Sequence, residues 1–267
     1  FTSAKDHWQN DIIFHKKRIK EENALSSFSL TNEEIVSFSG ISNSKIVFCK
    51  ESDAFSMYTS DRYGFNNPDS VWDNQADLIV LGDSFVHGAC VNSGDDLTSQ
   101  LRKLGNLNAI NLGWSNTGVL RQYASFIEYV KDYPEYIVWV YYENDLDNLE
   151  TELKNNILRQ YLDNVNFRQY LTSDNKRKII DEGILKEHLK YMETDHDIDM
   201  RVKTYTNFIN FLKLYKTRRM VLSIFKDFLK VDKNFELKKY EDLLNKYFLL
   251  FDRLKNKAYK NNSKILF

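Results

Sequence analysis

The sequence predicts an α/β fold in which helices cover a parallel sheet, interrupted by a long α-helical insertion. Between residues 77 and 142, short apolar runs alternate with amphipathic stretches of helical length, which is typical of such sheets. After Asn148 the spacing of apolar residues is helical for more than a hundred residues. Turn residues are scarce there, because eight of the nine glycines and both prolines come earlier. A chain of 267 residues allows one domain with a sizeable insertion.

The core elements follow in order along the chain. Short apolar runs predict strands at residues 77–81, 108–112 and 136–141, and the start of a fourth strand at 264–267. The stretches between the first three strands predict helices at residues 95–104 and 117–131. We therefore expect the α/β core to comprise residues 61–149 and 263–267.

Residues 1–60 are expected to form an N-terminal extension. Two apolar runs, 45–50 and 54–58, predict a hairpin or two edge strands. Residues 6–22 predict a leading helix, and the sequence Thr-Asn-Glu-Glu at 31–34 predicts a capping box for a second, short helix.

Residues 150–262 are expected to form the helical insertion, which would act as a cap over the strand ends. Its clearest stripe has apolar residues at three- and four-residue steps. The members are Leu237, Tyr240, Leu244, Tyr247, Phe248, Phe251 and Leu254. Similar stripes occupy residues 205–215 and 220–229.

Composition excludes several classes of protein. With 42% hydrophobic and 28% charged residues, the chain is of the folded kind, and it has no apolar run of the roughly 18 residues that a membrane-spanning helix needs. No Walker or dinucleotide glycine pattern and no metal-ligand spacing occur, so we expect no cofactor and no metal. Cys49 and Cys90 are expected to be free thiols, which leaves the localisation unassigned.

Charge is distributed unevenly between the two halves of the chain. Residues 1–150 carry a net charge of −10 and residues 151–267 one of +9. The basic half could attract an anionic polysaccharide or a lipid head group, or could be a solvated helical face that balances an acidic core. The near-neutral total and the lack of a recognised module argue against nucleic-acid binding. Membrane association is not visible in this sequence.

The most informative segment follows the first core strand. Gly82, Asp83 and Ser84 directly follow the apolar run, so Ser84 is expected at the carboxyl end of a parallel strand, where open α/β sheets bind their ligands. Gly82 permits a sharp turn there. A serine that begins the next element offers both a hydroxyl and a backbone N–H to a substrate carbonyl, although serine is also a common helix N-cap.

Three segments together resemble the SGNH, or GDSL-type, hydrolase family. Residues 82–85 (Gly-Asp-Ser-Phe) resemble its first block, with Phe85 in place of the usual Leu, and residues 111–118 (Asn-Leu-Gly-Trp-Ser-Asn-Thr-Gly) resemble the second. Residues 142–145 (Tyr-Glu-Asn-Asp) are similar to the third, Gly-x-Asn-Asp, with Tyr142 in place of Gly. The resemblance covers residues 62–148 and includes the lead-in from Asp61.

The resemblance implies a three-layer, flavodoxin-like SGNH fold and an esterase without a cofactor. Ser84 would be the nucleophile that attacks an ester of a small molecule or a glycan. The oxyanion would be bound by the Ser84 N–H, by a backbone N–H at Asn116 or Gly113, and by the Asn144 side chain, because donors aimed at this charge stabilise the transition state. Asp83 and Asp145 would support the loops.

The general base is the missing part of the pattern. In the resembling family a His follows a later strand, and we expect it beyond Phe267, in a chain cut at both ends, so that this fragment would show little turnover of an acetyl ester. His87 is too close to Ser84 in sequence to reach its oxygen easily and is expected to pack or to lie at the rim. His188 and His196 fall in the insertion, where residues 193–196 could imitate a carboxylate–His pair or form a solvated loop. His7 and His15 belong to the leading helix and are expected to be exposed.

Two other interpretations of the same residues stay open. The chain could be a catalytically inactive SGNH-like domain that binds a glycan or a protein partner, or a helical scaffold whose α/β part is structural. Asn144 and Asp145 could simply end a strand. A pocket that holds both Ser84 and Asn144 would favour catalysis.

Overall fold

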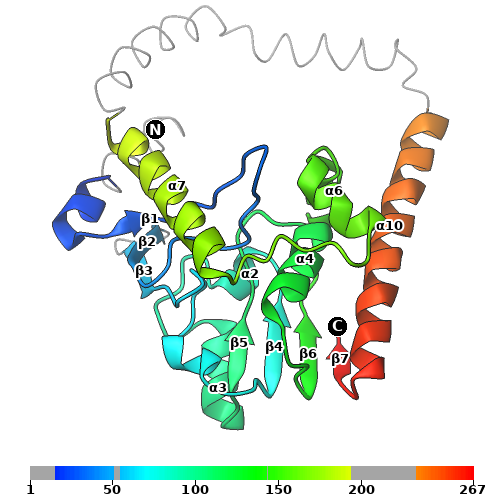
Figure 1. Cartoon of the computed structure of the whole chain (residues 1–267), viewed down its shortest axis with the longest axis horizontal. Coiled ribbons are helices and arrows are strands. Elements are labelled where there is room, and N and C mark those ends of the chain that lie inside the picture. Colours follow the sequence, from blue (N-terminus) through cyan, green and yellow to red (C-terminus); the bar gives the residue numbers. More distant parts are fainter. Residues whose placement is uncertain (1–15, 51–54, 143, 194–232) are drawn as a thin grey trace, which may run out of the picture.

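Four parallel strands form the central sheet, in the order β5-β4-β6-β7 (Figure 1). A computed structural model of the chain describes residues 16–50, 55–142, 144–193 and 233–267. The strands are β4 (Leu78–Leu81), β5 (Ala109–Asn111), β6 (Tyr136–Trp139) and β7 (Lys264–Leu266). All four predicted core strands are therefore confirmed, and the fold is α/β with a parallel sheet.

Strand β4 lies between β5 and β6 and is buried on both faces. Ile79 and Leu81 belong to the large hydrophobic cluster on one side of the sheet, whereas Leu78 and Val80 belong to a small cluster on the other side. Every residue of β4 is buried. This two-sided burial explains why the strand is a continuous apolar run rather than an alternating one.

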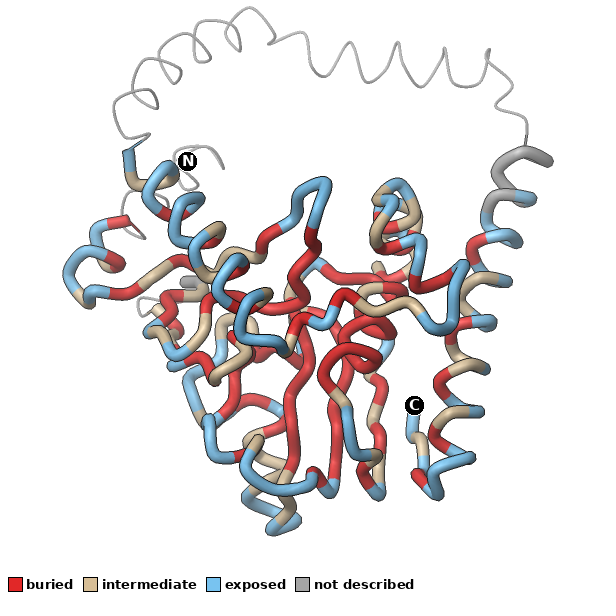
Figure 2. Tube along the Cα trace, viewed as in Figure 1, coloured by how far each residue is buried: buried red, intermediate tan, exposed pale blue. Residues whose placement is uncertain are grey.

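Helices cover the two faces of the sheet unequally. Helix α4 (Val119–Tyr129) packs with α10 (Lys233–Lys260) in the large cluster, and α3 (Leu97–Gly105) packs against β5 on the other face. The two helices predicted between the strands are α3 and α4, so both are confirmed. Figure 2 shows the buried residues concentrated in the strands and in α4. Val138 on the second face of β6 is only half-buried, so that layer is thin.

The N-terminal residues add a small sheet of order β1-β2-β3. Strands β2 (Lys45–Lys50) and β3 (Phe55–Thr59) form an antiparallel pair, as predicted, and β1 (Leu25–Ser26) runs parallel to β2. Residues 16–22 are helical; the rest of the predicted leading helix lies outside the described residues.

The predicted capping box at residues 31–34 is wrong. Thr31 forms an isolated antiparallel bridge with Val36, and the Asn32 side chain accepts hydrogen bonds from the N–H groups of Glu34 and Ile35, both at 2.9 Å. An Asn side chain that bonds to the following backbone stabilises a turn instead of a helix.

The helical half contributes α5 (Asp145–Glu152), α6 (Asn156–Asp163), α7 (Asp174–Glu193) and α10. One hydrophobic cluster contains residues from the N-terminal segment, from the core and from these helices, among them Leu30, Ile79 and Leu254. Helix α10 thus packs as a layer of the sandwich. None of the described helices is both long enough and apolar enough to cross a membrane.

The buried face of α10 differs in part from the predicted stripe. Leu243, Leu250, Leu254 and Ala258 are buried and Tyr247 is partly buried against the same cluster, whereas Tyr240, Leu244 and Phe248 are exposed. Apolar residues on two adjacent sides of one helix allow two choices of stripe, and packing selects one. The predicted stripes at 205–215 and 220–229 lie outside the described residues.

The prediction of a free thiol is wrong for Cys90. Cys90, in the loop after α2 (Ser84–His87), is disulfide-bonded, whereas the side chain of Cys49 lies outside the described part of the structure. Spacing in the sequence alone does not indicate whether a cysteine is bonded. Disulfides persist mainly in oxidising compartments.

Candidate functional site

The candidate site lies at the carboxyl end of β4. In the sheet, β5 lies on one side of β4 and β6 on the other, and both come after β4 in the sequence. The strand order therefore reverses at β4, and α/β sheets bind ligands at such a reversal. The chain turns sharply at Gly82, where a Cβ atom would lie 2.5 Å from Val86 Cγ2 and 3.2 Å from the Val140 oxygen. Any larger residue would clash at this turn, which explains the glycine.

Ser84 begins the short helix α2 but does not cap it. The cap is Asp83, whose side chain accepts a hydrogen bond from the Phe85 N–H at 3.0 Å. Ser84 is half-buried, and within the described part of the chain neither its hydroxyl nor its N–H has a hydrogen-bond partner. The alternative that Ser84 is only an N-cap is therefore wrong, and its two polar groups are available to a ligand.

The second loop, residues 113–118, has two candidate backbone donors, Gly113 and Asn116, and only one of them is free. The Gly113 N–H donates to Asn111 Oδ1 at 2.8 Å, and a Cβ atom on Gly113 would lie 2.6 Å from the His87 nitrogen. Gly113 therefore serves close packing against α2. Asn116 is exposed in the left-handed conformation, with φ of 59°, which Asn tolerates. Its N–H finds no acceptor among the described residues, so Asn116 is the donor that remains free.

The third loop presents Asn144 at the start of α5. Asn144 is half-buried; its Oδ1 is buried without a partner, and its Nδ2 is neither buried nor bonded within the described residues. The amide group therefore has donor capacity at the surface of the site.

Asp145 anchors this third loop. Its carboxylate accepts hydrogen bonds from the Tyr142 N–H and from Gln122 Nε2, both at 3.0 Å, and Trp139 Nε1 donates to Gln122 Oε1 at 2.6 Å. Burial raises the pKa of Asp145 to about 6, and the charge of Asp83 acts in the same direction. The charge of Asp83 and the carboxylate of Asp145 therefore interact electrostatically at the strand ends.

Contacts between the loops bring the three segments together. The rings of Phe85 and Tyr142 are 5.0 Å apart, and the Trp114 N–H donates to the Gly82 oxygen at 3.2 Å. A Cβ atom on Gly118 would lie 2.8 Å from the Asp145 oxygen. The loops that carry Ser84, Asn116 and Asn144 thus meet at one edge of the sheet.

His87 is a packing residue. It is fully buried; Nε2 lies 2.9 Å from the Tyr58 hydroxyl and Nδ1 lies 3.1 Å from Ser115 Oγ. Its ring stacks on Trp114 at a centroid distance of 4.3 Å. Burial lowers the pKa of His87 to about 3, so the imidazole is neutral and both nitrogens are occupied.

The other described histidine is also engaged elsewhere. His188, on α7, accepts a hydrogen bond from the Ser26 N–H at 3.4 Å and lies 6.5 Å from the Phe28 ring, next to the small sheet. His7, His15 and His196 lie outside the described residues, as does most of the predicted pair at 193–196. Of the two histidines that the structure describes, neither serves Ser84.

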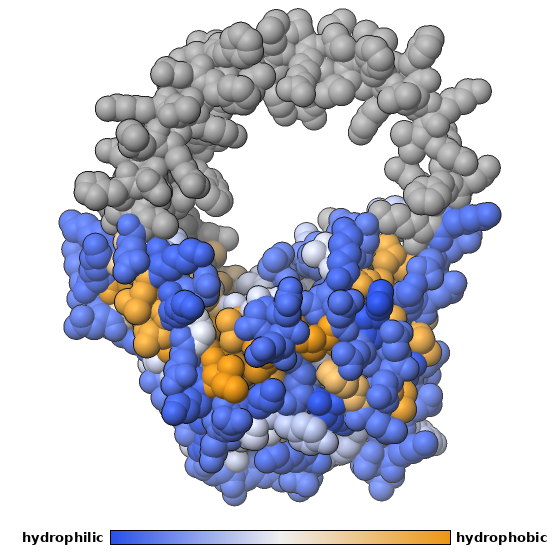
Figure 3. Space-filling model, turned by 45° about the horizontal axis from the view of Figure 1, so that its top comes forward, coloured by the Kyte–Doolittle hydropathy of each residue, from blue (hydrophilic) through white to orange (hydrophobic). Residues whose placement is uncertain are grey.

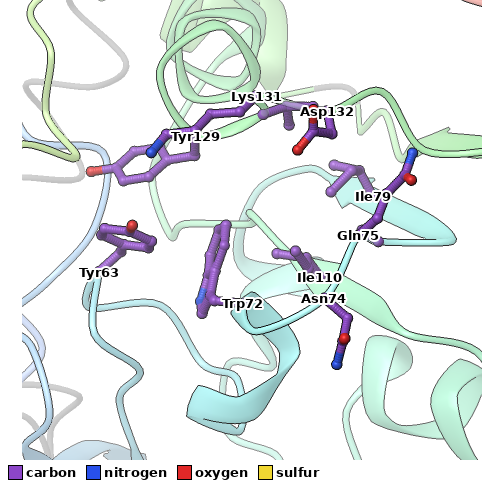
Figure 4. A pocket seen from close by; sticks show the side chains of 11 residues that line it. Tyr63, Trp72, Asn74, Gln75, Ile79, Ile110, Tyr129, Lys131 and Asp132 are labelled. Carbon is purple, nitrogen blue, oxygen red and sulfur yellow. The ribbon is translucent and has the colours of Figure 1, made fainter.

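A pocket at the opposite edge of the sheet has a different character. It lies at the amino ends of β4 and β5, where Tyr63, Trp72 and Tyr129 form aromatic walls and Lys131 and Asp132 lie at the rim (Figure 4). Trp72 Nε1 already donates to Asp61 at 2.8 Å. This pocket holds no serine and no histidine, so it offers no nucleophile of the kind found at Ser84.

No metal site stands out in the described part of the chain. Among the residues that the structure describes, no three His, Cys, Asp or Glu side chains are grouped to hold a metal ion. The face in Figure 3 is mostly hydrophilic, with separate apolar patches across its middle.

Sequence reasoning missed the side chains that hold the loops. Asn111 accepts from Gly113 and donates to the Val86 oxygen at 2.6 Å, and Gln122 links Trp139 to Asp145. Glu152 binds the N-terminus of α4. Of these residues, only Asn111 could have been recognised from the sequence, because it is a polar residue inside an otherwise apolar strand.

Comparisons of this chain with models of protein families, with curated proteins and with solved structures found no match. The arrangement of the three loops is therefore the basis for assigning a function.

Proposed function

We propose that the protein is a serine esterase or acyltransferase of the SGNH kind, acting on an oxygen ester of a small molecule or a glycan. The observation that carries the proposal is that the loop of Ser84, whose hydroxyl is unpaired and accessible, contacts two other loops that carry unpaired donors. Unpaired polar groups gathered at a strand-end switch point are what a ligand site requires.

The sheet order supports the finer fold assignment as well. Numbered from the first core strand, the order β5-β4-β6-β7 reads 2-1-3-4, which agrees with the flavodoxin-like order of doubly wound sheets. Helices on both faces agree with three layers, although the second face is covered mainly by α3.

The proposed reaction begins when the Ser84 oxygen attacks the ester carbonyl carbon. The negative charge that develops on the carbonyl oxygen would be stabilised by the N–H groups of Ser84 and Asn116 and by Asn144 Nδ2. The alcohol then leaves and an acyl-enzyme remains, which water or a second alcohol resolves. Each such donor is worth roughly 10²–10³ in rate.

A group other than His87 and His188 must accept the serine proton. Both ring nitrogens of His87 are bonded on the inner side of α2, and His188 packs beside β1. A histidine base of the kind that the resemblance implies would therefore have to come from outside the described residues.

Ester turnover by the full-length protein tests the proposal. With p-nitrophenyl acetate, we expect Ser84→Ala to abolish turnover and Asn144→Ala to lower kcat by about 100-fold. Ser99→Ala is the matched control, because Ser99 is also half-buried in a first helical turn but its hydroxyl donates to Asp96 at 2.6 Å; it should keep normal turnover. A fluorophosphonate adduct on Ser84, located by mass spectrometry, would identify the nucleophile directly.

The alternative is an inactive domain that binds a glycan or a protein. The bonded state of both described histidines favours it. If the full-length protein neither turns over esters nor reacts at Ser84, while Asn144→Ala weakens binding of an acetylated oligosaccharide, the site binds without catalysis.

A further inference from the structure

Glu152, the last residue of α5, caps a different helix. Its Oε1 accepts a hydrogen bond from the Gly118 N–H at 2.6 Å, and its Oε2 accepts from the N–H groups of Leu120 and Arg121, both at 3.2 Å. These are N–H groups of the N-cap residue and of the first turn of α4, which lack partners within that helix. A carboxylate from α5 therefore joins the two helices.

The remote cap replaces a local one that packing forbids. Helices α3 and α6 are capped by their own preceding residues, Asp96 and Asn155. The corresponding residue of α4 is Gly118, where a Cβ atom would lie 2.7 Å from the Leu149 nitrogen on α5. No side chain fits at this position, so the close contact of α4 with α5 requires a cap from elsewhere.

The same two segments carry two donors of the candidate site. Asn116 lies two residues before Gly118, and Asn144 directly precedes α5. Between them, Asn148 Nδ2 donates to the Thr117 oxygen at 3.3 Å. Whatever fixes Gly118 on α5 therefore also fixes the Asn116 N–H relative to Asn144.

We infer that Glu152 is a positioning residue for the proposed reaction, which holds the loop of residues 113–118 on α5 and thereby keeps the Asn116 and Asn144 donors at a constant separation. The inference rests on the proposed function. Glu152 touches no reacting atom, and it acts through the two donors. Misplacing such donors slightly can lower a rate by orders of magnitude.

The charge of Glu152 makes this joint sensitive to pH. Glu152 is buried, and burial raises its pKa to about 7, although the Arg121 guanidinium and the three N–H donors oppose this shift. Arg121 is the charged group that faces it. When the joint opens, Glu152 returns to its ordinary pKa of about 4.5. The open joint then binds fewer protons than the closed one between pH 4.5 and 7, so opening becomes easier as the pH rises through this window and levels off above it.

Activity measurements on the full-length protein separate positioning from plain stability. We expect Glu152→Ala to lower kcat for p-nitrophenyl acetate at least 10-fold with KM changed less than 2-fold. Glu152→Gln should restore only part of the loss, because its single side-chain oxygen can accept from only one side of the three N–H groups. In an Asn144→Ala background the effect of Glu152→Ala should shrink, because one of the two donors is already absent.

Glu128→Ala is the matched control. Glu128 is also a buried carboxylate; it accepts from the Gln169 and Leu171 N–H groups and from the Tyr161 hydroxyl, none of which belongs to the three loops of the candidate site. Its replacement should lower stability but leave the effect of Asn144→Ala unchanged. An effect of Glu152→Ala equally large with and without Asn144 would overturn the inference.

Hydrogen exchange gives an answer that does not depend on turnover. In the wild-type protein, exchange of residues 113–118, corrected for the intrinsic rate, should rise about 10-fold or more between pH 5 and pH 7; Glu152→Gln should abolish that rise. Exchange of residues 113–118 that is the same in the wild type and in Glu152→Ala at every pH refutes the inference. If the expected profile occurs without Ser84-dependent turnover, Glu152 fixes the loop and the proposed function alone fails.

Discussion

The polar side chains on the two sides of α2 differ in whether they have hydrogen-bond partners. Those on the side that faces the core, beneath α2, are paired, and those on the side of the candidate site, above it, are not. Beneath the helix lies a buried polar network of Asp61, Asn66, Asn67, His87 and Asn111. Asp61 alone accepts four hydrogen bonds, from the N–H groups of Tyr63 and Phe65 and from the side chains of Asn67 and Trp72. The Asn67 amide in turn exchanges hydrogen bonds with the Asn111 backbone and accepts one from Arg102.

Above the helix the polar groups lack partners within the described residues. Ser84 Oγ is unbonded and accessible, and Asp83 Oδ2 and Asn144 Oδ1 are buried without a hydrogen bond. Buried polar atoms are nearly always paired in folded proteins. The difference indicates that the network beneath α2 stabilises the fold, whereas the groups above it are kept for a ligand or water.

The largest effect is expected from breaking the complete network. Asp61→Ala removes the acceptor of four donors, and leaving buried donors unpaired costs about 1–3 kcal/mol each. We expect the free energy of unfolding, measured in urea, to fall by at least about 3 kcal/mol.

The control for Asp61→Ala is a carboxylate of the same loop region at the surface. Asp73→Asn removes an exposed ion pair with Arg62, which is worth about 0–1 kcal/mol. Equal losses in the two variants would mean that the pairing of Asp61 does not matter.

His87 gives a pH-dependent test of the same network. Burial lowers the pKa of His87 to about 3. Below pH 6.5 the His87 side chain is therefore protonated in the unfolded chain but stays neutral in the folded chain. The stability that His87 contributes is complete above pH 6.5 and is lost as the pH falls, by about 1.4 kcal/mol per pH unit and about 3 kcal/mol by pH 4.

The measurement compares urea unfolding of the wild type and of His87→Phe between pH 7.5 and pH 4. Phe keeps the stacking on Trp114 but cannot titrate, so the wild type should lose its advantage as the pH falls. Asp145 and Glu152, whose pKa values are raised to about 6 and about 7, have the opposite pH dependence in both proteins and cancel in the difference. Parallel pH profiles would contradict the buried, neutral state of His87.

The sequence predicts most of the fold because strands and helices depend on local patterns. The run Leu-Ile-Val-Leu at residues 78–81 is apolar throughout because β4 is buried on both faces. Two local patterns failed where tertiary packing or a competing turn decided the outcome. The stripe on α10 is shifted by its neighbours, and Asn32 forms a turn where a helix cap was predicted.

The candidate site is predictable only in part, for a related reason. Ser84 and Asn144 could be found because each follows an apolar strand, and parallel strands present their carboxyl ends at one edge. The roles of Gly113 and Glu152 could not, since they depend on contacts between distant segments. Gly118 and Glu152 are 34 positions apart, and no pattern within either segment indicates that they meet.

The smallest effect on stability is expected at the unpaired groups themselves. In Asp83→Asn the cap on α2 can persist, because an Asn oxygen also accepts from the Phe85 N–H, and the second oxygen had no partner to lose. We expect the free energy of unfolding to change by less than about 1 kcal/mol. Removing the charge should also lower the pKa of Asp145 below its wild-type value, since Asp83 raises it, and carboxyl carbon NMR measures this directly. A loss as large as that of Asp61→Ala would show that Asp83 belongs to the stabilising network, and the division of α2 into a structural side and a ligand side would then fail.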